Sequence, residues 1–155
     1  MIDLKLILKG KVVMLCIGNI ERGDDGAGPV LAGIIKDKAP FEVIDVGTAP
    51  ENWTGVVKRS HPDTIIIVDA VNFDGEPGDV KIFSGNDLRS GKISTHDVSP
   101  KLLIQYLKES TKARIYVLAI RPVSNRLGEG LSLPVESTIK GLSRELSALN
   151  NAGCE

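Results

Sequence analysis

Three polar side chains in this sequence have the chemistry of a metal-binding or acid–base site: Asp25, Asp69 and His96. Asp25 is the second of two adjacent aspartates in "GNIERGDDGAGP", and Asp69 closes the apolar run "IIIVDA". His96 stands in the polar stretch "STHDVS". Two carboxylates and one imidazole suit a divalent metal of intermediate hardness, because imidazole favours nickel, zinc or iron over magnesium. Three protein ligands also leave coordination positions open, as a catalytic site requires.

Each of these groups also has an ordinary structural interpretation. An aspartate before "GAGP" can cap a helix, Asp69 can anchor a turn, and His96 can lie at a helix start. One cap needs only one carboxylate, so we expect Asp24 to cap the helix and Asp25 to point into a crevice. The helix dipole would keep Asp25 ionised, which suits a metal ligand better than a general acid.

The elements that must position these residues are predicted from the apolar patterns. Apolar or β-branched runs predict five strands, at residues 12–18, 41–47, 64–71, 79–84 and 114–120. Helices are expected at residues 27–38, at 51–60, from Ser99 onward and near the carboxyl terminus. Their predicted buried stripes are Ala27, Leu31, Ile34 and Ile35; Trp53, Val56 and Val57; Leu102, Leu103, Tyr106 and Leu107; and Val135, Ile139, Leu142, Leu146 and Leu149.

This alternation predicts the fold class α/β: one three-layer domain over residues 1–155, with a twisted, mostly parallel five-stranded sheet and helices on both faces. The strand at 64–71 should be central. The link "NFDGEPG" is too short for a crossover helix, so the strand at 79–84 should be antiparallel to its neighbour. In a flavodoxin-like order the first and third strands flank the ligand crevice. Neighbouring strands lie about 4.8 Å apart, so Asp25 and Asp69 can reach one small ligand.

The composition indicates an ordinary soluble globular domain, with 42% hydrophobic and 25% charged residues. A formal net charge of -1 offers no basic surface for nucleic acid, and no apolar run approaches membrane-spanning length. Cys16 lies inside an apolar run and Cys154 in the tail, which argues against a disulfide framework. We therefore expect a monomeric, cytoplasmic protein with no nucleic-acid partner and no membrane insertion.

The motifs together resemble one protein family. The strand end "CIGN" followed by "GDDGAGP" is similar to the amino-terminal motif of the hydrogenase maturation endopeptidases, and "VDA" and "STHDVS" stand where that family has its second acid and its histidine. The resemblance extends over most of the chain, and "DDGAGP" looks most like the members that serve hydrogenase 3. It implies that Asp25, Asp69 and His96 bind the metal and form the catalytic site of an aspartate-based protease.

The resemblance also implies a substrate. Members of this family remove a C-terminal extension from the large-subunit precursor of [NiFe] hydrogenase, after a basic or histidine residue. The nickel inserted in the precursor would be the recognition element, so the enzyme alone should hold divalent metal only weakly. The sequence lacks His-Glu-x-x-His and Gly-x-Ser-x-Gly, the motifs of ordinary proteases. Two mechanisms stay open: the metal polarises the scissile carbonyl, or Asp25 or Asp69 activates water.

Two other classes of function fit parts of the sequence. A non-catalytic nickel-sensing or nickel-carrying module would use the same three ligands but leave the tail of its partner intact. A nucleotide-binding oxidoreductase is a weaker alternative, because Gly18 and Gly23 do not have the Gly-x-Gly-x-x-Gly spacing and the paired acids would repel a pyrophosphate.

Two loops, at residues 84–95 and 121–130, are candidates for substrate contact at the same end of the sheet. Arg121 and Arg126 lie in the second loop and would either meet acidic groups or remain solvated. His61 precedes Pro62 in the connection to the third strand, at the end of the sheet opposite the proposed crevice. We therefore expect His61 to have no role in the chemistry.

Overall fold

The computed structural model describes residues 4–89 and 99–152, which form one five-stranded sheet flanked by helices. The strands are β1 (Val12–Ile17), β2 (Glu42–Gly47), β3 (Thr64–Ala70), β4 (Val80–Ser84) and β5 (Arg114–Ile120), and their order is β2-β1-β3-β5-β4. All neighbouring pairs are parallel except β4 with β5. The predicted strand positions, the central place of β3 and the antiparallel direction of β4 are confirmed.

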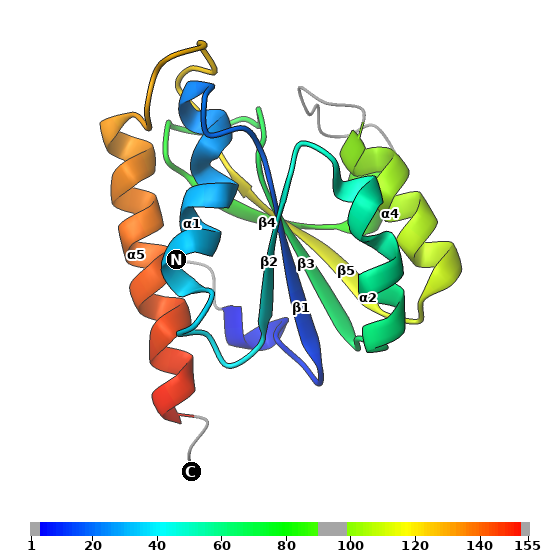
Figure 1. Ribbon diagram of the computed structural model, residues 1–155. Coiled ribbons are helices and arrows are strands. Elements are labelled where there is room, and N and C mark those ends of the chain that lie inside the picture. The colour runs from blue at the N-terminus through cyan, green and yellow to red at the C-terminus, as the bar shows by residue number, and fades with distance from the viewer. Residues whose placement is uncertain (1–3, 90–98, 153–155) are drawn as a thin grey trace.

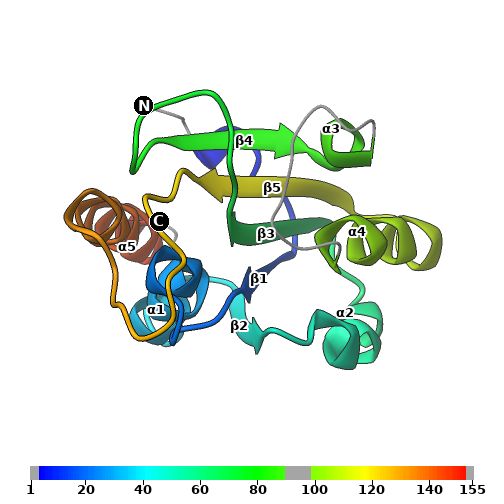
Figure 2. The same cartoon turned by 90° about the horizontal axis from the view of Figure 1, so that it is seen from above.

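Helices cover both faces of the sheet, as Figures 1 and 2 show. On one face lie α1 (Ala27–Ile35) and α5 (Leu133–Ala152), and on the other lie α2 (Thr54–Ser60) and α4 (Ser99–Ser110). Shorter helical segments are η1 (Leu4–Leu6), η2 (Gly23–Gly26), η3 (Pro50–Trp53) and α3 (Gly85–Arg89). The predicted three-layer α/β architecture is therefore confirmed.

The core consists of two clusters, one on each face of the sheet, because successive strand residues point to opposite faces. In β1, Val13 and Leu15 pack in the cluster under α2 and α4, whereas Met14 and Cys16 pack in the cluster under α1 and α5. Every residue of β1 and β3 is buried, as expected for parallel strands covered on both sides. Burial on both faces is why these two strands were the plainest apolar runs in the sequence.

The helix stripes were predicted well for α5 and less well for α1 and α4. Val135, Ile139, Leu142 and Leu146 of α5 are buried, whereas Ile34 of α1 is 37% exposed. In α4 the buried residues are Leu103, Ile104 and Leu107, and the predicted Leu102 and Tyr106 are 63% and 45% exposed. Five of the six residues from 102 to 107 are apolar, which is enough to cover more than one face of the helix. Only one of these faces packs against the sheet.

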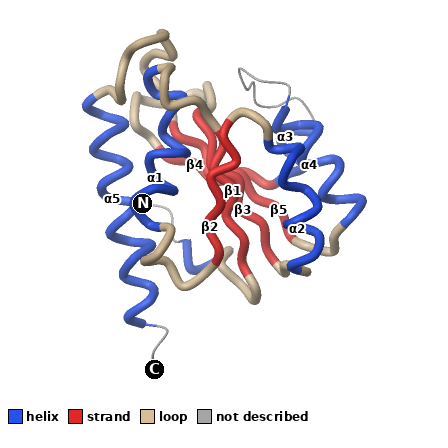
Figure 3. The backbone as a smooth tube through the Cα atoms, viewed as in Figure 1, coloured by secondary structure: helices blue, strands red, loops and turns tan. Residues whose placement is uncertain are grey.

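Two connections decide where a ligand can bind. The chain passes from β1 to β2 through α1 on one face and from β2 to β3 through α2 on the other face (Figure 3). The strand order therefore reverses between β1 and β3, and this is the position where open α/β sheets bind ligands. The loop predicted from residue 84 begins instead with the short helix α3, and residues 90–98 lie outside the described part of the chain.

No helix within residues 4–89 and 99–152 is both long and apolar enough to cross a membrane.

Candidate active site

The turn after β1 brings α1 unusually close to the ends of β1 and β3. A Cβ atom on Gly28 would lie 2.5 Å from the carbonyl oxygen of Ile17 and 3.2 Å from that of Val68. Gly18 has a φ of +148°, and a Cβ there would lie 1.9 Å from the carbonyl oxygen of Asp25. Only glycine fits both positions. These two glycines let η2 and the start of α1 pack directly over the carboxyl ends of the two strands.

Asp25 lies in η2 at this turn, immediately before α1. Its side chain is partly buried, and its Oδ2 accepts a hydrogen bond of 3.1 Å from the backbone N–H of Asn19. The same N–H donates to the backbone carbonyl of Asp25, also at 3.1 Å. The carboxylate is thus held by the loop that follows β1, at the amino-terminal end of a helix where negative charge is favoured.

Asp69 lies one residue before the end of β3 and is 4% exposed. It pairs with Ala119 of β5, and on its other side β3 pairs with β1 up to Cys16. Because η2 also packs against β3, the structure brings Asp25 and Asp69 to the same end of two adjacent strands. Both residues thus lie at the predicted end of the sheet, and the expectation that their side chains reach one ligand stays a prediction.

His96, the third predicted ligand, lies outside the described residues, between α3 and α4. Within residues 4–89 and 99–152 there is no group of three His, Cys, Asp or Glu side chains that could hold a metal ion. The assignment of His96 as a ligand therefore stays a prediction, and so does the three-ligand metal site.

The prediction that Asp24 caps α1 is wrong. The N-cap position of α1 is Gly26, and no side chain bonds to the helix there. Asp24 is 1% exposed, and its carboxylate instead accepts hydrogen bonds from the loop between β5 and α5. The donors are Val123 N at 2.8 Å, Ser124 N at 3.3 Å, Ser132 N at 2.7 Å and Ser132 Oγ at 2.8 Å.

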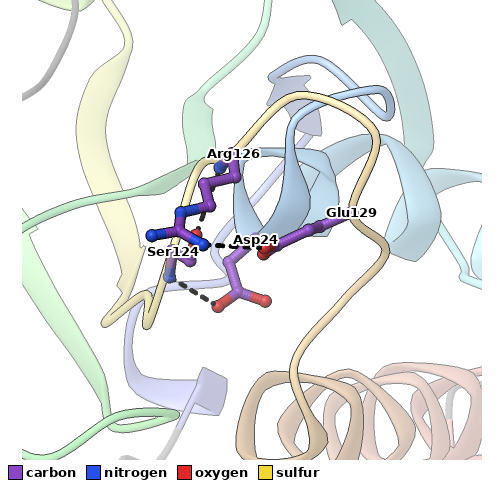
Figure 4. Close-up of polar contacts among 4 residues, drawn as sticks. All are labelled: Asp24, Ser124, Arg126 and Glu129. Carbon is purple, nitrogen blue, oxygen red and sulfur yellow. Dashed lines mark hydrogen bonds and ion pairs between the residues drawn. The ribbon is translucent and has the colours of Figure 1, made fainter.

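The physical reason for this arrangement is that the loop needs acceptors for its backbone N–H groups. Residues 121–132 lie between a strand and a helix, so regular strand or helix bonding supplies no acceptor for the N–H groups of Val123, Ser124 and Ser132. One buried carboxylate supplies two oxygens to four donors at once, and Figure 4 shows it facing Ser124. Three of the four donors are backbone groups about 100 residues away, so no side-chain pattern in the sequence signals the contact.

Backbone hydrogen bonds tie the same loop to the turn after β1. Asp24 N donates to Ser124 O at 2.8 Å, Gly23 N to Glu129 O at 2.9 Å, and Gly128 N to Glu21 O at 2.7 Å. Arg22 and Leu127 also form an antiparallel bridge. We call residues 19–24 and 121–133 together the double loop. It stands beside the candidate site, because Asn19 at its start holds the carboxylate of Asp25.

The two arginines of the loop differ in environment. Arg126 has an 83% exposed side chain that pairs with Glu129 at 3.9 Å, as in Figure 4, so it is a solvated surface charge. Arg121 is partly buried, and its Nη1 donates to Asn72 Oδ1 at 2.5 Å. The Nε of Arg121 is buried and has no hydrogen-bond acceptor among the described residues. Arg121 is therefore held in the loop at the end of β5.

Two residues that the sequence analysis set aside lie where expected. Cys16 is fully buried in β1, and burial, with a smaller contribution from the negative charge of Asp45, raises the pKa of its thiol far above the usual range. Such a thiol is not a nucleophile near neutral pH. His61 ends α2 with a left-handed φ of 49°, just before β3 and at the opposite end of that strand from Asp69. Cys154 lies outside the described residues.

Comparison with known proteins identifies the family. The family model described as hydrogenase maturation protease matches residues 30–148. The hydrogenase 3 maturation protease of Escherichia coli (strain K12) is 32% identical over 144 residues, which cover 91% of this chain and 92% of that protein. The chain belongs to the hydrogenase maturation protease family.

Solved structures of the hydrogenase maturation protease family share this fold. The crystal structure of the [NiFe] hydrogenase maturation protease HycI from Thermococcus kodakarensis KOD1 superposes with a TM-score of 0.83 at 29% identity, covering 94% of this chain and 96% of that chain. The solution structure of the endopeptidase HycI from Escherichia coli has a TM-score of 0.78 at 29% identity, covering 91% and 92%. These relatives are named as proteases or endopeptidases, enzymes that hydrolyse peptide bonds, which agrees with the function that the sequence predicted.

Proposed function

We propose that this chain removes the C-terminal extension from the large-subunit precursor of a [NiFe] hydrogenase. The observation that carries the proposal is the position of Asp25, in η2 after β1, and Asp69, near the end of the adjacent strand β3, where the strand order reverses. Membership of the hydrogenase maturation protease family supports the reaction type, and the precursor is the substrate that the family name implies. We further propose that the enzyme works as a monomer in the cytoplasm.

The nickel inserted in the precursor is the recognition element of this proposal. Asp25 and Asp69 supply two oxygen ligands from a rigid sheet end, and we propose His96 as the nitrogen ligand that completes the set. Carboxylate and imidazole donors suit nickel better than they suit magnesium. The precursor supplies the remaining ligands, so the metal would arrive with the substrate and leave with the product. The two aspartates are also the candidates for activating water.

The test compares nickel-loaded and nickel-free precursor as substrates of the wild-type protein. The mass of the large subunit is followed over time, and loss of the tail should be seen only with the loaded form. Equal trimming of both forms would contradict nickel recognition but leave the protease assignment intact. Tight binding of the loaded form with no trimming would favour the alternative, a nickel-sensing or nickel-carrying module.

A further inference from the structure

The double loop displays apolar side chains to solvent beside the candidate site. Within the described part of the chain, eight large hydrophobic residues are more than a third exposed. Four of them belong to the double loop: Ile20 at 65%, Val123 at 56%, Leu127 at 67% and Leu133 at 82%. The other four are spread over η1, α1 and α4. Half of the exposed large apolar residues therefore gather on two short segments at one end of the sheet.

These segments are fixed in place. Three backbone hydrogen bonds, the bridge between Arg22 and Leu127, and four bonds to the buried carboxylate of Asp24 hold the two loops together. The two loops are therefore held in one arrangement before any partner binds. A surface that is ordered in advance loses less entropy when a partner binds, which strengthens binding without adding contacts.

The double loop is also continuous with the candidate site. Asp24 and Asp25 are neighbours, and their side chains go to different partners, Asp24 to the loop after β5 and Asp25 to Asn19. Ile20 directly follows Asn19. A protein that touches Ile20 therefore lies against the same turn that holds the carboxylate of Asp25.

The charges on the double loop do not favour a partner of either sign. Glu21 and Arg22 are adjacent and exposed, and Arg126 pairs with Glu129. Opposite charges this close largely cancel at a distance. A partner would therefore be held through apolar contact, and its affinity should depend little on salt.

We infer that the double loop is the docking surface for the folded body of the precursor, outside its cleaved tail. This inference rests on the proposed function, since it names the partner of the same site. The partner presents an apolar patch around the point where its tail emerges, and Ile20 and Leu127 pack against that patch. The buried carboxylate of Asp24 holds this surface next to Asp25.

The experiment measures kcat and KM for tail removal from nickel-loaded precursor by the double variant Ile20→Ser/Leu127→Ser. Both side chains are exposed, so the fold should persist, which the melting temperature checks. We expect KM to rise about tenfold, from the loss of two apolar contacts, while kcat stays within about twofold. KM of the wild type should change less than about twofold when salt is raised to about 0.3 M.

The matched control is Leu6→Ser. Leu6 is 72% exposed, close to the 67% of Leu127, but lies in η1 ahead of the amino end of β1. Its KM should equal that of the wild type. An unchanged KM in the double variant, an equal rise in the control, or a fall confined to kcat would overturn the inference. So would sedimentation showing that the double variant loses a self-association that the wild type has.

Binding is measured separately from cleavage, so that the two proposals can fail separately. The dissociation constant of immobilised nickel-loaded precursor should rise about tenfold for the double variant and not for Leu6→Ser. If the three proteins bind the precursor with these relative affinities but the wild type does not cleave it, the docking surface is supported and the proposed protease function is contradicted. If wild type cleaves the precursor and all three proteins bind equally, the function stands and the docking surface falls.

Discussion

At each end of the sheet the carboxylate of one aspartate joins two segments of the chain, but the two aspartates differ in burial and in their neighbours. At the amino end, Asp63 accepts a hydrogen bond of 2.7 Å from Lys11 N and so joins the start of β1 to that of β3. At the carboxyl end, Asp24 joins the turn after β1 to the loop after β5. Asp63 is exposed and has no second acid beside it, whereas Asp24 is buried and is followed by Asp25. Both aspartates anchor a neighbouring segment of the chain, and only Asp24 is followed by a second acid, the one that we propose as a site residue.

The largest effect should come from removing either carboxylate of the candidate site. Asp25→Asn and Asp69→Asn each keep the size of the side chain but remove its charge, and each should lower the rate of tail removal about a thousandfold. The double variant should be little worse than either one, because a site that has lost one ligand has little left to lose. Mass spectrometry of the precursor measures the rate, and Asp63→Asn is the control at the other end of the sheet. A loss in the control as large as in Asp25→Asn would remove the distinction between the two ends.

The two histidines allow the same test of a candidate site residue against a control. His96→Ala should abolish tail removal if His96 is the nitrogen ligand, whereas His61→Asn should leave the rate within about twofold. Asn suits the second test because it tolerates the left-handed backbone that His61 adopts. The measurement is the rate at which each variant removes the tail from nickel-loaded precursor. Loss of activity in His61→Asn alone would show that His61, and not His96, is the histidine of the site.

The two anchoring aspartates, Asp24 and Asp63, should contribute differently to the free energy of unfolding. Asp24→Ala leaves four donors without their acceptor in a buried place, so we expect it to lower the free energy of unfolding by about 3 kcal/mol. Asp63→Ala, at an exposed position, should cost about 1 kcal/mol. Urea denaturation of the two variants and the wild type measures the difference. Equal losses would mean that burial does not distinguish the two anchors.

The smallest effect should come from Cys16. Cys16→Ala should lower the free energy of unfolding by about 1 kcal/mol and leave tail removal unchanged, since the thiol is fully buried in the core cluster under α1 and α5. Because its pKa is raised, the thiol is neutral at pH 8 and should resist alkylation while the protein is folded. Mass spectrometry after treatment with iodoacetamide checks this. Rapid alkylation of Cys16 in the folded protein, or loss of activity in Cys16→Ala, would point to a thiol mechanism.

The sequence by itself determined the sheet and the place of the two candidate site residues Asp25 and Asp69. Strands β1, β3 and β5 were predictable because both faces of each are covered, which makes them continuous apolar runs. The short link before β4 determined its antiparallel direction. Asp25 and Asp69 were predictable because strand ends can be located from local pattern, and parallel strands bring their carboxyl ends to one edge.

Only the tertiary structure decided the role of Asp24 and the orientation of α4. The residues next to Asp24 in the sequence predict that it caps a helix. In the structure its partners are mostly backbone N–H groups about 100 residues away. Backbone donors carry no residue-specific signal, so the contact is invisible in the sequence. In α4 the apolar residues cover more than one face, and the position of the sheet selects Leu103, Ile104 and Leu107 for burial. Long-range contacts of this kind depend on where the whole chain has folded, not on the pattern of nearby residues.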